Sequence, residues 1–220
     1  MGKGNKAVPF SALATAKRCA IDLIVDQEGT LACDHAVGLC LPTASTRDLA
    51  DAVHALCHLH GAAPSLVTLA ASPDADNALE RMAAAFDAER AMLATVTAAV
   101  GPIPSTPRHA QSEAAITTQR HALATLAQSA RMGCAGGAAL ALLLDWHAVR
   151  AVLTAAAARA NIAVPPSQLP SRTTILAAAQ DMATDPSRSR ALAFGAQQLA
   201  VQHHGLWRLL AARAEARSAL

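Results

Sequence analysis

Three ionisable residues occupy positions that apolar side chains would normally fill. Glu89, His147 and His203 each lie in a run of apolar residues spaced three or four positions apart, and this spacing predicts the buried face of an α-helix. A buried carboxylate or imidazole needs a partner, because an unpaired buried charge is costly or is neutralised by a pKa shift. One carboxylate and two imidazoles suit iron, zinc or manganese, so the three residues are candidate metal ligands.

Each candidate also has an explanation without chemistry. Arg120 lies opposite Glu89 if their helices form an antiparallel hairpin, and the two would then make a buried ion pair. A single histidine on an apolar face is commonly a core residue with its own partner. We therefore expect separate partners for the three candidates rather than one shared ion. Asp145 is two residues from His147, so we expect it to face away from that histidine.

A second polar group shares one helical face near residue 50. Asp51, His54 and His58 follow the spacing i, i+3, i+7, and the apolar residues of the same segment define the opposite face. We expect this polar face to be exposed to solvent. The sequence has no glycine-rich phosphate loop, Walker motif or nucleophile elbow, so it does not decide whether the protein is an enzyme.

Composition restricts the classes of protein that fit. The 220-residue chain is alanine-rich, a bacterial-type composition, and it contains no tyrosine. A net charge of +2 argues against a nucleic-acid partner, which requires a strongly basic surface. No apolar run approaches the roughly 20 residues of a membrane span, so no membrane association is expected. Five cysteines without paired spacing favour free thiols and a cytoplasmic location.

The elements that must position these residues are predicted to be long helices. Residues 45–220 form a helical bundle domain, and residues 1–44 form an N-terminal arm in which strand-like Ala20–Val25 leaves room for a short hairpin. The predicted helices span residues 45–63, 65–71, 73–100, 107–132, 134–161, 172–182 and 186–217. Three of them begin at a capping side chain followed by proline, namely Ser72-Pro73, Thr106-Pro107 and Asp185-Pro186. Short connections predict antiparallel neighbours.

Four long helices with inward Glu and His residues resemble the ferritin-like bundles over residues 73–217. Members that bind two metals carry Glu-x-x-His on two helices, and this motif is absent here. The nearest string, Asp51-Ala-Val-His54, lies on the predicted solvent face. We expect a cytoplasmic helical-bundle protein, without a cofactor, that acts through protein or small-ligand contacts or as a homo-oligomer. The alternative is a ferritin-like oxidoreductase that holds iron, zinc or manganese on a reduced ligand set.

Overall fold

The computed structural model describes residues 19–71 and 77–219, and within them the protein is entirely helical, without a strand. The helices are α1 (Ala20–Glu28), the 3-10 helix η1 (Thr30–Ala32), α2 (Asp34–Leu39), α3 (Thr46–His60), α4 (Leu66–Ala70), α5 (Asn77–Ala99), α6 (His109–Ala127), α7 (Cys134–Arg159), α8 (Arg172–Met182) and α9 (Pro186–Ser218). The predicted all-α class is confirmed.

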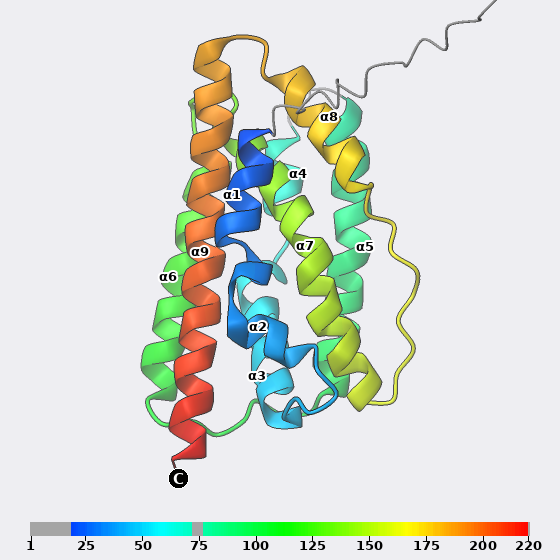
Figure 1. The fold of residues 1–220 in the computed structure, drawn as a ribbon, viewed down its shortest axis with the longest axis vertical. Coiled ribbons are helices and arrows are strands. Elements are labelled where there is room, and N and C mark those ends of the chain that lie inside the picture. Colours follow the sequence, from blue (N-terminus) through cyan, green and yellow to red (C-terminus); the bar gives the residue numbers. More distant parts are fainter. Residues whose placement is uncertain (1–18, 72–76, 220) are drawn as a thin grey trace, which may run out of the picture.

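Helix α7 is the core of the fold. It lies between α9 on one side and α5 on the other (Figure 1), and it also contacts α1, α3, α4, α6 and α8. Nearly all side chains from Cys134 to Trp146 are buried, so this part of the helix is apolar around its whole circumference rather than along one stripe. Within the described residues it alone has the length and hydropathy of a membrane span, and most of it is buried inside the fold.

Helices α7 and α9 run in the same direction and touch through glycine. A Cβ atom on Gly137 would lie 2.0 Å from the carbonyl oxygen of Leu192, and one on Gly195 would lie 1.9 Å from that of Cys134. Residues 160–171 run back along the side of the molecule to α8 (Figure 1), which allows α9 to start beside the N-terminal end of α7. The glycines set the distance and register at which the two helices meet.

The predicted antiparallel pairing of the helices containing Glu89 and Arg120 is wrong. Helices α5 and α6 lie on opposite sides of the molecule (Figure 1), and α3 and α4 contact both of them. Residues 100–108, which connect α5 to α6, cross the base of the fold instead of making a tight hairpin. The pairing between α6 and α7 is confirmed, because these helices are in contact.

The predicted strand at Ala20–Val25 is also wrong, because these residues form α1. The β-branched residues Ile21 and Val25 are four positions apart and both are buried. Helix α1 packs on α9 and α7, so tertiary contacts outweigh the strand preference of its residues. The boundary between arm and bundle at residue 44 remains a prediction.

The three predicted proline entries have different outcomes. Asp185 caps α9 by accepting hydrogen bonds from the backbone N–H groups of Ser187 and Arg188, with Pro186 at the first position, which confirms this entry. Ser72-Pro73 lies outside the described residues. The Thr106 hydroxyl contacts Pro104 and Arg217 instead of capping, and α6 begins only after Arg108.

Helix α6 ends at Ala127, and Gly133 precedes α7 with a φ of 93°.

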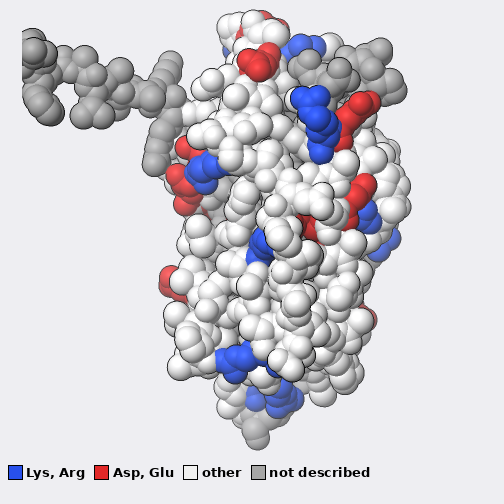
Figure 2. All heavy atoms as spheres, turned by 90° about the vertical axis from the view of Figure 1, so that its right-hand side faces the viewer, with Lys and Arg blue, Asp and Glu red and all other residues white. Residues whose placement is uncertain are grey.

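On the face formed by α5, α8 and residues 160–171, charged side chains of both signs are scattered over a mostly uncharged surface (Figure 2).

Candidate functional site

A chain of hydrogen bonds runs through the core from α7 to α3. Asp145 of α7 accepts a hydrogen bond from Nδ1 of His203 on α9, with Oδ2 and Nδ1 2.6 Å apart. The Nε2 atoms of His203 and His60, the last residue of α3, are 2.9 Å apart. All three side chains are buried, with exposed fractions of 3 %, 1 % and 6 % in the order Asp145, His203, His60. These hydrogen bonds therefore lie in the core, where breaking one of them would leave a buried polar group unsatisfied and would lower the stability of the fold.

Thr30 completes the inner end of this chain. Its backbone N–H and its hydroxyl each donate to one carboxylate oxygen of Asp145, both at 2.7 Å. The hydroxyl in turn accepts from the indole N–H of Trp207 at 2.9 Å. Trp207 follows His203 by one helical turn on α9, so α9 supplies two of the groups. The Asp145 carboxylate accepts three donors and is held in one orientation.

The partners determine which ring nitrogens carry protons. Burial, followed by the nearby His203 and Arg90, lowers the pKa of His60 well below its ordinary value, so His60 is neutral. The carboxylate of Asp145 fixes a proton on Nδ1 of His203. With His60 neutral, its Nε2–H donates to Nε2 of His203, and its Nδ1 is left with a lone pair. The carboxylate–imidazole pair resembles that of a catalytic triad, with a second imidazole in place of the nucleophile.

His60 is the member of this chain that reaches a cavity. The cavity has a volume of about 290 Å³ and lies among α3, α4, α5 and α6. Its walls are formed by Leu59, His60, Ala62, Pro64, Ser65, Leu66, Leu69, Phe86, Arg120, Leu123, Ala124, Ala127 and Gln128. Among the described residues, Nδ1 of His60 has no hydrogen-bond partner. This nitrogen is the one available to a ligand.

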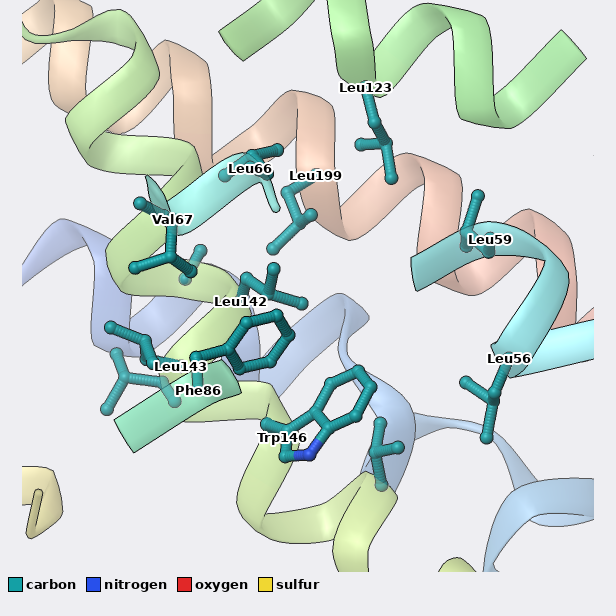
Figure 3. Close-up of a cluster of buried hydrophobic side chains, with 14 of the residues drawn as sticks. Leu56, Leu59, Leu66, Val67, Phe86, Leu123, Leu142, Leu143, Trp146 and Leu199 are labelled. Atoms are coloured by element: carbon teal, nitrogen blue, oxygen red, sulfur yellow. The ribbon is translucent and has the colours of Figure 1, made fainter. Parts of the chain in front are cut away.

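Aromatic rings hold His60 in place. Its ring meets that of Trp146 edge-on, with centroids 5.3 Å apart, and Trp146 meets Phe86 in the same way at 4.8 Å. Phe86 and Trp146 lie against Leu142 and Leu143 of α7 (Figure 3). Such edge-to-face contacts add to the burial of the rings, so the orientation of His60 is fixed by packing as well as by hydrogen bonding.

Glu89 is buried as expected, but its partner is not the predicted one. Its carboxylate contacts the guanidinium of Arg150 on α7 and accepts from the hydroxyl of Ser167 at 3.0 Å. Arg150 also donates to the carbonyl of Pro165. Arg120 cannot take this role because α6 lies across the molecule from α5. Glu89 therefore fastens α5 to α7 and to the segment that follows α7.

His147 does not lie on an inward face. It is exposed, and its Nε2 is 3.1 Å from the carbonyl oxygen of Pro170. The stripe that led to this prediction could not indicate a face, because the apolar residues before His147 cover all sides of α7. The buried ionisable residue of this helix is Asp145, which the sequence did not mark as a site residue.

The structure gives the three metal-ligand candidates separate partners. Both ring nitrogens of His203 are engaged, and the carboxylate of Glu89 is occupied by Arg150 and Ser167. Across the described residues, no group of three or more His, Cys, Asp and Glu side chains is arranged to hold a metal ion. The donor atoms of these candidates thus do not fit a shared metal ion.

Comparison with known proteins adds one finding. The family described as "Family of unknown function (DUF6975)" matches residues 25–218. The chain belongs to this family. Neither the curated proteins nor the solved structures contain a match. The matched range includes Thr30, His60, Asp145 and His203, so the whole buried chain lies within the family domain.

Asp51 is buried rather than exposed. Its carboxylate oxygens form ion pairs with guanidinium nitrogens of Arg213 and Arg217 on α9, at 2.7 and 2.6 Å. Arg217 also binds the carboxylate of Asp48. The apolar stripe of α3 did not reveal that α9 covers its polar face. The two histidines of the same face have separate partners: His54 lies 2.8 Å from the carbonyl oxygen of Gly101, and His58 lies 3.2 Å from the hydroxyl of Thr117. This cluster joins α3 to α9 and α6.

Sequence patterns missed three members of the buried chain. Thr30 lies in a turn-like segment and His60 at a helix end, where polar residues are ordinary. Asp145 carried a usable signal, because a single carboxylate within a run of leucines and alanines must be satisfied if the run is buried. Its partners come from segments more than fifty residues away, and helical periodicity contains no information about such distances.

Proposed function

We propose that the protein binds a small ligand in the cavity lined by His60, and that His60 is the hydrogen-bonding group that orients this ligand. The observation that carries the proposal is the buried chain from Asp145 through His203 to His60, which ends at the cavity wall. Apolar walls with a few fixed polar groups are typical of small-ligand sites. The two histidines and Asp145 support each other, so the ligand would meet a preorganised His60.

Ligand binding is better supported than covalent catalysis. A triad-like enzyme needs a nucleophile within hydrogen-bond reach of the histidine. Ser65 also lines the cavity, but its hydroxyl lies 2.7 Å from that of Thr68 and accepts from the Thr68 N–H. Within the described residues, no hydroxyl or thiol is bonded to His60.

The ferritin-like alternative has less support. The long helices are consistent with it, but the parallel packing of α7 on α9 and the occupied donors of Glu89 and His203 offer no centre for a metal. A cytoplasmic location remains part of the proposal, and it is supported by the five cysteines, all of which are free thiols.

Benzyl alcohol is a suitable first probe. Its ring matches the walls formed by Phe86, Leu66 and Leu123, and its hydroxyl can donate to Nδ1 of His60. We expect a saturable shift of the His60 ring-nitrogen signals in NMR spectra during titration, with a dissociation constant in the millimolar range because the probe is small.

A pair of alanine substitutions on α6 provides the control. Ala124 is exposed and lines the cavity, whereas Ala114 is exposed on the same helix and lies outside it. Ala124→Trp should block the cavity and abolish the shift at His60, and Ala114→Trp should leave it intact. Absence of a saturable shift in the unmodified protein, or equal binding by both variants, would refute the proposal.

A further inference from the structure

The cavity lined by His60 has a clear charge preference. Among the described residues that line it, Arg120 is the only one with a full charge, and none is Asp or Glu. Arg120 makes no ion pair or hydrogen bond with any residue that the structure describes. A guanidinium pairs best with a planar carboxylate, which it can bind through two parallel hydrogen bonds. The described part of the cavity wall thus offers a cation to a ligand and no carboxylate that would repel an anion.

His60 can present a donor as well as an acceptor. If His60 takes up one proton, its Nε2–H still donates to Nε2 of His203, and its new Nδ1–H donates into the cavity. The added positive charge then lies on His60, where a bound carboxylate would stabilise it. An anionic ligand would favour this protonated arrangement.

The remaining walls determine what else the ligand must have. Leu59, Leu66, Phe86 and Leu123 make most of the surface apolar, and Figure 3 shows these side chains converging from four helices. A volume of about 290 Å³ corresponds to roughly ten water molecules. This space suits a compact hydrocarbon body and excludes a large lipid or nucleotide.

We propose that the cavity binds small monocarboxylates with an apolar body, held by Arg120 and by a proton-donating His60, and that binding is coupled to uptake of one proton by His60. This inference rests on the proposed function, since it names the ligand class of the same cavity. The proton comes from the solvent and remains on His60, so the carboxylate is bound as an anion.

The surroundings of His60 account for the proton uptake. Of the charged and titratable groups in the described residues, those around His60 are His203 of α9 with Asp145 of α7 behind it, Arg90 of α5, and Arg120 of α6. Arg90 donates to the backbone carbonyl of His60 at 3.0 Å. Burial, His203 and Arg90 keep the unliganded His60 neutral, and a carboxylate bound beside it favours its protonation. Affinity should therefore rise as the pH falls.

The experiment is calorimetric titration of the full chain with benzoate, acetate and benzyl alcohol between pH 6 and 8. We expect benzoate to bind with uptake of about one proton, measured from buffers of different ionisation enthalpy, and with an affinity that falls by up to tenfold per pH unit. Acetate should bind at least about tenfold more weakly because it lacks the apolar body. Binding of benzyl alcohol should not depend on pH.

Two substitutions separate the roles of charge and proton. Arg120→Gln should weaken benzoate about tenfold and leave benzyl alcohol unchanged, whereas Arg208→Gln removes the same charge from an exposed site on α9 outside the cavity and should change neither. His60→Gln keeps an N–H donor that needs no added proton, so benzoate binding should lose its pH dependence.

The outcomes distinguish this inference from the proposed function. If benzyl alcohol binds but benzoate does not, or if benzoate binds without proton uptake, the carboxylate inference is wrong and the ligand cavity stands. If neither compound binds, the proposed function itself fails. If Arg120→Gln and Arg208→Gln weaken benzoate binding equally, the arginine acts only through the general charge of the protein, and this result would also overturn the inference.

Discussion

His60 is buried among groups that oppose its protonation. Burial is the largest cause, and His203 and Arg90 add to it, so the pKa of His60 lies well below its ordinary value of 6.5. The unfolded chain therefore binds a proton at this residue at a higher pH than the folded protein does. Stability from this residue is fully present above about pH 6.5 and is lost as the pH falls towards the folded pKa.

This asymmetry predicts the pH dependence of stability. Between pH 6.5 and 5.5 the wild-type protein should lose up to about 1 kcal/mol more unfolding free energy than His60→Gln does. Urea denaturation at several pH values measures the difference. His35, whose pKa is also lowered, mainly by burial, is present in both proteins and cancels. Parallel pH profiles for the two proteins would show that His60 titrates normally.

At the same scale, the sequence identified the middle of the buried chain and missed its two ends. His203 could be found because its leucine and alanine neighbours recur at helical spacing. Asp145 carried only the signal of a single carboxylate in an apolar run, and His60 carried none, since their roles depend on which helices meet in space. Arg150 was missed as the partner of Glu89 for the same reason: ion pairing follows from the arrangement of helices.

At the scale of the helices, the contact of α7 with α9 leaves no room for a side chain at its glycines. Gly137 faces the backbone of Leu192 so closely that a methyl group at 2.0 Å from its carbonyl oxygen would overlap it. Backbone atoms cannot move aside as a flexible side chain can, so the helices would have to separate. Separation would also lengthen the Asp145–His203 hydrogen bond, which lies about two turns further along both helices.

We therefore predict that Gly137→Ala lowers the free energy of unfolding by at least about 2 kcal/mol, in the range of overpacked cores. Gly38 in α2 is the matched control, because a Cβ atom at this residue would have no neighbouring atom within 4 Å. Gly38→Ala should be neutral or stabilise by about 0.5 to 1 kcal/mol through helix propensity. Thermal and urea unfolding of both variants would measure this, and equal stabilities would contradict the packing argument.

Element boundaries were predictable where the signal is local. Helix α8 was predicted with both of its ends, and Asp185 caps α9 as expected. The arrangement of α5 and α6 was not predictable. A connection of about nine residues can form a hairpin or can span up to about 30 Å, and only the contacts of α3 and α4 with both helices decide between the two.

At the scale of the whole molecule, burial is concentrated on one helix. Helix α7 is covered on nearly every side, whereas α8 buries only Ile175 and Ala179. Opening α7 requires most of the fold to come apart, while α8 can detach with little loss of core.

We predict that backbone amides of residues 138–153 exchange with solvent only through global unfolding, and that those of α8 exchange at least about a hundredfold faster through local opening. Native-state hydrogen exchange in low concentrations of urea measures both. Amides of α7 that exchange with no dependence on urea would contradict this picture of the core.

The position of α9 in the chain also has a consequence for biosynthesis. Helix α9 makes three contacts that hold the core together. His203 binds Asp145, Arg213 and Arg217 bind Asp51, and Gly195 packs against the backbone of α7. Helix α9 ends roughly sixty residues after α7, which the ribosome needs about 3 to 12 s to add. Throughout that interval the most apolar helix of the nascent protein lacks its cover and two core carboxylates lack their partners. A holding chaperone would find its binding site there, on residues 134–159, and would be displaced as α9 docks.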